Sequence, residues 1–294
     1  IVRELRVLLD RYPGSMSVGE VFDENPGNHS LSAEYLGNGR DELHLAFDFS
    51  LIFEKWDARR FFERIAGQYA ALPADSWPCF VLSNHDNSRS RSRIEGRSGN
   101  AARSRVAMTL LLTLRGTPFL YYGEEIGMRD GPVKKGEIVD PVGKKYWPFN
   151  KGRDPERTPM QWSDAQNGGF SSAAPWLPVN PDYRRINVRA QEGDPESLLS
   201  WVKNLIRLRK DHPALSRGSW EPVMRGENDL ISYTRALDSE RIFVLLNFSD
   251  RKRVHPPIGN LEALVSTRRE TGAGLPAGEI EVFPNEATVF LVRG

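Results

Sequence analysis

The sequence predicts an α/β fold built from parallel βα units and followed by a small antiparallel β domain. Short apolar runs of strand length alternate with longer segments whose apolar residues recur at helical spacing. Four such strands are about half of the eight that close a βα barrel. From about residue 216 the helical spacing gives way to paired segments of alternating polarity.

The βα units can be followed in chain order. The apolar residues Val2, Leu5 and Leu8 form a helical stripe that ends before Pro13-Gly14, and Gly116 ends a later helix. In order, we expect a helix at 2–9, strands at 16–21 and 43–47, a helix at 58–69, a strand at 79–82, a helix at 106–114, a strand at 117–122 and a helix at 198–206.

Two further segments differ from this pattern. Residues 129–195 show no clear periodicity and are rich in Gly, Pro, Asn and Trp, so we expect a long ordered loop over the barrel mouth. Most of its aromatic residues are expected to pack the loop down, while exposed Trp faces would stack well on sugar rings. In the last segment we expect strands at 230–235, 241–248, 279–283 and 288–292, with turns at 238–239 and 284–285.

Acidic residues follow each of the four expected barrel strands. They are Glu20, Asp48, Asp86, and either Glu124 or Glu125. In barrels of parallel strands the carboxyl ends of the strands carry the chemistry, so this coincidence indicates an enzyme. The third strand is the clearest case, because the stretch PCFVLSNHDNSR from 78 to 89 delivers an amide, an imidazole and a carboxylate at its tip.

Composition excludes several classes of function. The 294 residues carry 40 basic and 39 acidic side chains, so net charge gives no argument for nucleic acid or a membrane surface. Six arginines lie between 89 and 105, at positions 89, 91, 93, 97, 103 and 105, and we interpret them as a solvated loop leading into a helix. No apolar run approaches the roughly 20 residues of a membrane span. The single cysteine, Cys79, is expected to be a small buried side chain.

The pattern of side chains points to chemistry without a cofactor. Neither metal-ligand spacing nor a glycine-rich phosphate loop after a strand occurs, so we expect no cofactor and no metal. Glu20 and Asp86 at the tips of two strands suit acid–base work in a shared cleft, as glycoside hydrolysis requires. His85 could donate a hydrogen bond to a sugar hydroxyl. A hydrolase or a glycosyl transferase is the leading class.

Three motifs in order carry a specific resemblance. FVLSNHD, GTPFLYYGEEIGM and RDPERTPMQW are similar to segments of the α-amylase family of glycoside hydrolases (family 13), and SVGEV at 17–21 fits the strand that carries its acid/base. The last motif resembles the α-glucosidase and oligo-1,6-glucosidase branch. The resemblance implies the C-terminal half of a (β/α)8 TIM barrel at 1–215, with the long loop 129–195, and a small antiparallel β-sandwich domain at 216–294.

The resemblance also implies roles for single residues. Glu20 would be the general acid/base, and Asp86 would bind sugar hydroxyls and help to distort the ring. His85 would contact the same sugar, and Arg153 the glucose at the cleaved bond. Two other residues of the RDPERTPMQW motif, Arg157 and Gln161, are expected to hold the loop in shape. For Glu124 and Glu125 we favour a structural role, such as pairing with nearby arginines.

The family's nucleophile is an aspartate on the strand before the SVGEV strand, and no motif here matches it. We therefore expect a piece of a longer protein: a retaining α-glucosidase half that is inactive alone, located in the cytoplasm and acting on oligosaccharides of the maltose, isomaltose or sucrose type. Two alternatives stay open. One is a transglycosylating or isomerising relative of the trehalose synthase or sucrose isomerase type. The other is a non-catalytic binding subunit with the amylase fold, such as an amino-acid-transporter heavy chain.

Overall fold

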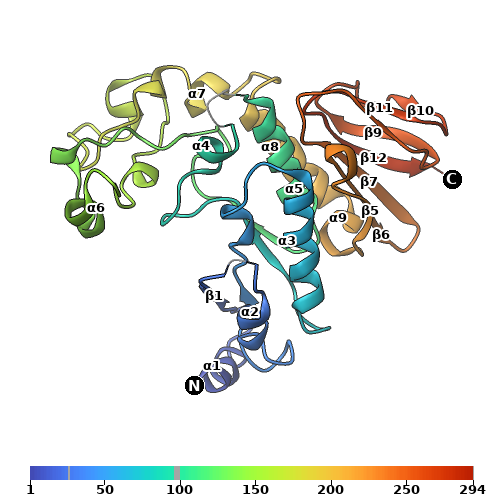
Figure 1. Cartoon of the computed structure of the whole chain (residues 1–294), viewed down its shortest axis with the longest axis horizontal. Coiled ribbons are helices and arrows are strands. Elements are labelled where there is room, and N and C mark those ends of the chain that lie inside the picture. The colour runs from blue at the N-terminus through green and yellow to red at the C-terminus, as the bar shows by residue number, and fades with distance from the viewer. Residues whose placement is uncertain (26, 96–99, 294) are drawn as a thin grey trace. The chain divides into compact units, whose positions relative to one another are not determined.

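A computed structural model describes residues 1–25, 27–95 and 100–293 (Figure 1). The chain forms two compact units, each described here by itself. The first comprises residues 1–81, 109–119 and 208–294, and the second comprises 82–108 and 120–207. None of the helices in the described ranges is long and apolar enough to cross a membrane.

The helices and strands have the following bounds. The α-helices are α1 (Val2–Leu9), α2 (Ser30–Glu34), α3 (Ala58–Ala71), α4 (Ser90–Ile94), α5 (Ala102–Thr113), α6 (Pro141–Tyr146), α7 (Val188–Gln191), α8 (Leu198–Asp211) and α9 (Pro213–Arg217). Short 3-10 helices are η1 (Ser50–Ile52), η3 (Lys135–Glu137), η4 (Pro155–Arg157), η5 (Gln166–Gly169), η6 (Pro181–Arg184) and η7 (Glu227–Asp229). The strands are β1 (Val18–Gly19), β2 (Leu45–Ala46), β3 (Cys79–Val81), β4 (Thr117–Phe119), β5 (Glu221–Arg225), β6 (Leu230–Leu237), β7 (Glu240–Asn247), β8 (Arg253–His255), β9 (Asn260–Ser266), β10 (Gly274–Leu275), β11 (Ile280–Val282) and β12 (Ala287–Arg293).

The first four strands pair in parallel and in chain order. β1 pairs with β2, and β3 pairs with β4, in both cases in parallel. Asp48, two residues beyond β2, forms a parallel bridge with Phe80 of β3 and so connects the two pairs. The alternation of strand and helix predicted from the sequence is confirmed, although each strand is shorter than expected.

Helix α3 shows why its sequence forms an amphipathic helix in the first unit. Asp57 caps its first turn by accepting a hydrogen bond from the backbone N of Arg60 at 2.9 Å. Phe61 and Ile65, one turn apart, are both buried. The Phe61 ring lies edge-on to Phe248, with centroids 5.4 Å apart. The apolar stripe therefore packs on the residue that follows strand β7.

The carboxyl end of α5 is completed by arginine side chains. The last carbonyl groups of a helix lack partners within it and need donors from elsewhere. The Arg209 guanidinium donates to the carbonyl oxygens of Leu112 and Leu114 at 2.9 and 3.0 Å. Buried Arg235 of β6 donates to the carbonyl of Thr113 at 2.6 Å. The turn that leads into β4 is therefore fixed by charged donors.

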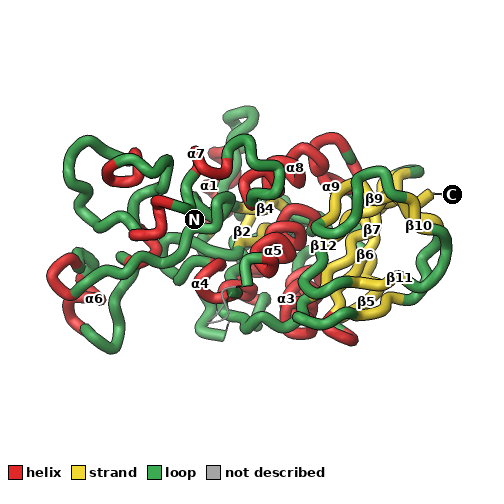
Figure 2. Tube along the Cα trace, turned by 90° about the horizontal axis from the view of Figure 1, so that it is seen from above, coloured by secondary structure: helices red, strands yellow, loops and turns green. Residues whose placement is uncertain are grey.

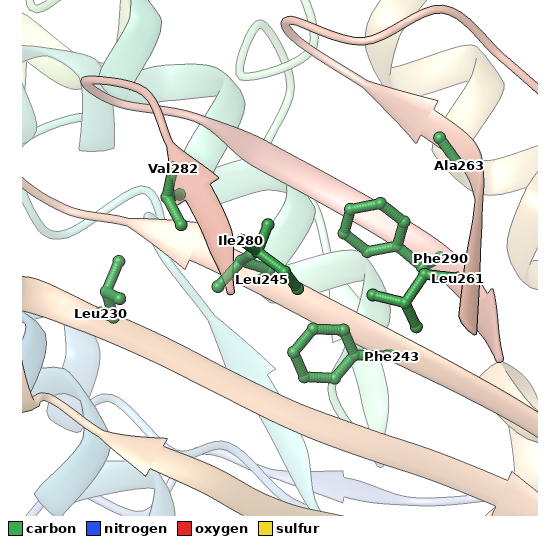
Figure 3. Close-up of a cluster of buried hydrophobic side chains, with 8 residues drawn as sticks. All are labelled: Leu230, Phe243, Leu245, Leu261, Ala263, Ile280, Val282 and Phe290. Carbon is green, nitrogen blue, oxygen red and sulfur yellow. The ribbon is translucent and has the colours of Figure 1, made fainter. Parts of the chain in front are cut away.

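The C-terminal strands, called the β domain below, pair in antiparallel sheets, as the sequence predicted. Six strands pair in the order β10-β9-β12-β7-β6-β5, and β8 pairs with β11 separately; Figure 2 shows strands of the larger sheet side by side. The β6–β7 hairpin turns at Asp238-Ser239, where Asp238 adopts a left-handed backbone with φ of 51°. Figure 3 shows the buried apolar cluster of this domain: Leu230, Phe243, Leu245, Leu261, Ala263, Ile280, Val282 and Phe290.

The arginine-rich run in the second unit does not form the solvated loop expected from the sequence. Arg89 is fully buried, with its guanidinium carbon 4.9 and 4.6 Å from the ring centroids of Tyr121 and Tyr122. Arg91 donates to the carbonyl of Gly127 at 2.6 Å. Arg93 donates to the carbonyl of Ser88 at 2.9 Å, and burial lowers its pKa to about 10. These arginines anchor loops inside the unit, so the solvated-loop interpretation was wrong for them; Arg97 lies outside the described residues.

Candidate active site

The third barrel strand ends in a turn that presents two candidate residues. After β3 the chain continues through Leu82 and Ser83, which are both buried. The side-chain oxygen of Asn84 then accepts hydrogen bonds from the backbone N of Asp86 and from Nδ2 of Asn87, both at 3.0 Å. This side-chain turn fixes the backbone at His85 and Asp86, because a short amide can bond to the chain two residues on.

Three cationic or imidazole side chains converge on the Asp86 carboxylate. Arg157 donates from Nη2 to Oδ1 at 2.7 Å, and Arg153 donates from Nη1 to the same oxygen at 3.1 Å. Nε2 of His85 lies 3.3 Å from Oδ2. Arg157 also donates from Nε to the carbonyl of His85 at 2.7 Å, which ties the RDPERTPMQW loop to the strand tip. Predicted site residues His85, Asp86 and Arg153 are therefore brought together within the second unit.

Arg153 is held in turn by Asp140, a residue that the sequence analysis did not single out. Oδ2 of buried Asp140 accepts hydrogen bonds from Nε and from the backbone N of Arg153, at 2.7 and 2.9 Å. The other oxygen of Asp140 caps α6 by accepting from the backbone N of Val142 at 2.9 Å. The hydrogen bond from Arg153 lowers the pKa of Asp140 to about 2.

Asp140 itself is fixed by a second buried carboxylate. Oδ2 of Asp154 accepts from the backbone N of Val139 at 2.6 Å and from that of Asp140 at 3.0 Å. The segment between Asp140 and Asp154 thus folds back on itself beside Arg153. The signal that could have revealed Asp140 was the Asp-Pro pair, because Asp at an N-cap followed by proline marks the start of a helix.

Gln161 and Arg157 of the RDPERTPMQW motif were both expected to hold the loop in shape, and they differ in the structure. Gln161 is buried, and its Nε2 donates to Oδ1 of Asp182 at 2.9 Å and to the carbonyl of Ile186 at 2.5 Å, as expected for a residue that holds the loop in shape. Arg157 does more than the expected shaping, because it contacts the Asp86 carboxylate directly. Sequence reasoning missed this contact because the two residues lie 71 positions apart.

The two glutamates after β4 differ in their surroundings. Glu124 is buried; it accepts a hydrogen bond from the Ser83 hydroxyl and another from the backbone N of Tyr121 at 2.9 Å, and burial raises its pKa. The nearby Arg93 interacts electrostatically with this carboxyl group, in keeping with the structural role that we expected. Glu125 is half-buried, and burial raises its pKa as well.

Glu20 lies in the first unit, directly after β1, with its side chain exposed. At the same edge of this parallel pair, Asp48 follows β2 and is buried; its Oδ1 accepts from the backbone N of Ser50 at 2.7 Å, and burial raises its pKa. Glu20 and Asp86 belong to different units. Their joint action on one sugar therefore stays a prediction.

A groove of about 340 Å³ in the second unit adjoins the Asp86 cluster, because Arg157 belongs to both. Its walls are mostly aromatic and apolar, with two charged side chains. The lining residues are Tyr122, Glu125, Arg157, Pro159, Met160, Trp162, Phe170 and Trp176.

Comparison with known proteins identifies relatives over most of the chain. A probable α-glucosidase of Rhizobium meliloti (strain 1021) is 35% identical over 90% of this chain, and an oligo-1,6-glucosidase of Parageobacillus thermoglucosidasius is 32% identical over 98%. A human amino acid transporter heavy chain is 34% identical over 79%. These matches span 48%, 57% and 32% of the respective relatives, so the chain covers about half the length of the two glucosidases.

Solved structures with the same fold extend the comparison. The α-glucosyl transfer enzyme XgtA superposes with a TM-score of 0.88 at 32% identity, covering 99% of this chain and 54% of that one. The trehalulose synthase MutB from Pseudomonas mesoacidophila MX-45 gives 0.85 at 30% identity, covering 99% and 58%. The family model of the α-amylase catalytic domain matches residues 1–218. The chain therefore belongs to the α-amylase family.

Proposed function

We propose that this chain is part of a retaining α-glucosidase that releases terminal α-linked glucose from oligosaccharides. The observation that carries the proposal is the Asp86 carboxylate, which Arg153 and Arg157 hold beside His85 at a strand tip. Such a cluster of charged donors and acceptors is suited to hydrogen-bond the hydroxyls of one sugar ring, because charge-assisted hydrogen bonds are strong and directional. The names of the glucosidase relatives support the same class of substrate.

In this proposal the reaction proceeds in two steps. Glu20 donates its proton to the glycosidic oxygen as the bond to the anomeric carbon breaks, and a carboxylate nucleophile forms a glycosyl-enzyme intermediate. Glu20, now ionised, then takes a proton from the water that releases glucose with its configuration retained. Asp86, with Arg153 and His85, holds the glucose hydroxyls while positive charge develops at the anomeric carbon.

We further propose that the nucleophile comes from polypeptide outside this sequence. The part of the chain that the structure describes provides four parallel strands, whereas a complete barrel has eight. The chain also covers only about half the length of its glucosidase relatives. A retaining mechanism needs two carboxyl groups about 5–5.5 Å apart, and the carboxyl opposite Glu20 would belong to the other barrel half. The chain alone should then be inactive.

Two other functions have support among the relatives. The likeness to XgtA and MutB favours glucosyl transfer or isomerisation, which would use the same first step with a sugar or alcohol in place of water. The human transporter heavy chain favours a non-catalytic subunit. The presence of Glu20, His85 and Asp86 in this chain supports an enzyme over a binding subunit.

The deciding experiment is incubation of the complete protein that carries this chain with maltose, isomaltose and sucrose separately, with products separated by chromatography. We expect free glucose as the main new product. Isomaltulose, trehalulose or longer oligosaccharides as the main products would replace hydrolysis with isomerisation or transfer. No product from any of the three would favour the non-catalytic subunit.

A further inference from the structure

A small buried cavity beyond the end of β2 brings an imidazole and a carboxyl group face to face. His29 and Asp48 are 9% and 4% exposed. Oδ1 of Asp48 accepts a hydrogen bond from the backbone N of Ser50 at 2.7 Å, whereas Oδ2 has no hydrogen-bond partner among the described residues. Nδ1 of His29 lies 3.9 Å from Oδ2, which is too long for a direct hydrogen bond. A buried carboxyl oxygen without a partner is costly, so we expect a polar ligand between the two side chains.

The size of the cavity selects this ligand. Its volume is about 20 Å³, and a buried water molecule needs about 10–15 Å³ and two to four polar partners. Two hydrogen bonds of about 2.8 Å that span the gap of 3.9 Å would meet at an angle of roughly 90°, which a water molecule can accept. Ser32 also lines the cavity, and its hydroxyl would be a third polar partner. Among the described residues no group of three or more His, Cys, Asp and Glu could hold a metal ion, so a single water molecule is the ligand that fits.

The walls of this cavity are held in place by their own contacts. Both carboxylate oxygens of Asp23, which lines the cavity, are engaged: Oδ1 accepts from the backbone N of Asn25 at 2.8 Å, and Oδ2 accepts from Nδ2 of Asn28 at 2.9 Å. The His29 ring packs closely on α3, because a Cβ atom added at Gly67 would lie 3.0 Å from Cδ2 and Nε2 of the ring. A water molecule in the cavity would therefore find its partners in fixed positions.

The cavity adjoins the residue that we assign as the acid/base. Before Glu20, the carbonyl of Gly19 accepts a hydrogen bond from the backbone N of Phe47 at 2.9 Å. After Glu20, Val21 lines the cavity together with Asp48. The chain is thus fixed on one side of Glu20 by the segment that follows β2, and on the other side by its packing around the cavity. A shift of Val21 would also shift Glu20, because the two residues are adjacent.

The ionisable side chains that interact with Asp48 come from three elements. They are His29 at the start of α2, Arg64 on α3 and Cys79 on β3. Burial raises the pKa of Asp48, although the hydrogen bonds with Ser50 and the charges of His29 and Arg64 oppose this rise. Because a raised pKa favours the neutral acid, asparagine is a close substitute. Its side-chain oxygen can accept from Ser50, and its NH2 group can donate to the water molecule.

We propose that one ordered water molecule joins Nδ1 of His29 to Oδ2 of Asp48, and that this buried bridge positions Glu20. His29 and Asp48 are then positioning residues, which act on the reaction only through the acid/base. The second part rests on the proposed function, in which Glu20 protonates the glycosidic oxygen as the bond breaks. Proton transfer requires Glu20 within hydrogen-bond reach of that oxygen, so a small shift of its backbone is enough to slow the step.

The bridge itself is tested by a crystal structure of the complete protein that carries this chain, at a resolution that shows ordered water. We expect a single water molecule at about 2.6–3.2 Å from both Nδ1 of His29 and Oδ2 of Asp48. A direct contact between the two side chains, a metal ion in this position or a cavity without water would overturn this part. The result does not depend on whether the protein acts on sugars.

The positioning role is tested with two substrates that differ in their need for a proton. Phenyl α-glucoside needs a proton from Glu20 as its bond breaks, whereas fluoride leaves α-glucosyl fluoride without one. Asp48→Leu and His29→Leu should each lower kcat/KM for phenyl α-glucoside by about tenfold and leave kcat/KM for α-glucosyl fluoride within about twofold of wild type. Asp48→Asn should recover most of the loss, to within about threefold of wild type.

Two further variants separate positioning from general damage. His255→Leu also removes a buried imidazole, but one that is hydrogen-bonded to Ser232 in the β domain, and it should leave the ratio of the two kcat/KM values unchanged. Equal losses on both substrates in the Asp48 and His29 variants, or no loss on either, would overturn the positioning role. Glu20→Gln should show the same selectivity with a larger loss on phenyl α-glucoside. Wild-type kinetics of Glu20→Gln on both substrates would refute the proposed function and the positioning role with it, while the crystal structure still decides the bridge.

Discussion

Asp140 holds Arg153 by accepting hydrogen bonds from both its Nε, at 2.7 Å, and its backbone N, at 2.9 Å. The guanidinium fixed in this way reaches Asp86 through Nη1 at 3.1 Å. A buried carboxylate thus sets the direction of an arginine that we expect to contact the glucose. Because small misplacements of such groups lower the catalytic rate strongly, we expect Asp140 to be needed for activity although it does not contact Asp86 in the structure.

Asp140→Asn should lower kcat/KM for maltose by about a hundredfold. The amide of Asn can still cap α6 through its oxygen, but its NH2 group would then face the two N–H donors of Arg153. Steady-state kinetics of the complete protein measure the effect, and the far-ultraviolet circular dichroism spectrum checks that the fold persists.

A double-variant cycle separates positioning from general damage. If Asp140 acts through Arg153, then Asp140→Asn should lower kcat/KM for maltose hardly any further in an Arg153→Met background. Independent, additive losses in the double variant would show that Asp140 supports activity by another route.

The stability of the fold should fall as pH rises because of Glu156. This glutamate of η4 is buried, and burial together with the nearby Asp130 charge raises its pKa to about 8. Between the ordinary value of 4.5 and about 8 the folded protein binds more protons at this site than the unfolded chain does. The stability that Glu156 contributes is therefore fully present below pH 4.5. It is lost as pH rises from 4.5 to about 8, by at most about 1.4 kcal/mol of unfolding free energy per pH unit.

Glu156→Gln removes this titration and should flatten the dependence of Tm on pH between about 4.5 and 8 relative to wild type. Differential scanning calorimetry across that range measures it. A variant whose Tm follows the wild-type curve in parallel would show that another group governs the pH dependence.

Arg89 should be needed for stability rather than for solubility or ligand binding. Its guanidinium lies over Tyr121 and Tyr122 and donates to the carbonyl of Tyr122 at 2.6 Å. Arg89→Ala should cost about 2–4 kcal/mol of unfolding free energy, from the lost charged hydrogen bond and the lost contact with the rings. Lys203→Ala, on an exposed lysine 3.7 Å from Glu192, should change it by less than about 0.5 kcal/mol, as urea unfolding can test. Similar effects of both variants would contradict a buried anchoring role.

The β domain should depend on the cluster in Figure 3. Phe243 is fully buried and stacks on Phe290, with ring centroids 6.1 Å apart. Phe243→Ala should lower the unfolding free energy by about 3–5 kcal/mol, since it removes buried apolar surface and leaves a cavity. Val254→Ala, at a side chain that is 48% exposed, is the control and should have little effect. A loss below about 1 kcal/mol for Phe243→Ala would mean that the domain repacks around the gap.

The order and direction of the barrel strands could be predicted because they depend on local patterns. Apolar runs bounded by polar residues predicted β1 to β4. Because the carboxyl ends of parallel strands share one edge, the residues that follow these strands could also be placed. The β6–β7 hairpin could be predicted for the same reason, because its strands alternate apolar and polar residues and a two-residue turn joins them. Such features are specified within about ten residues of sequence, so one sequence is enough to find them.

Contacts that join distant segments could not be predicted. The Asp86–Arg157 and Asp86–Arg153 pairs connect the strand tip with a loop about 70 residues later, and no local spacing encodes them. The burial of Arg89 was missed for a related reason, since its tyrosine partners lie more than 30 residues away. Charge-rich runs are usually solvated, and only the fold provides the rings and carbonyls that permit burial.

The most direct test of the account is the kinetics of Glu20→Gln in the complete protein with p-nitrophenyl α-glucoside. Loss of the acid/base should lower kcat by about 10²–10⁴-fold, and added azide, which needs no general base, should restore part of the rate and give α-configured glucosyl azide. Wild-type turnover in Glu20→Gln would contradict the assignment of this residue and with it the proposed glucosidase mechanism.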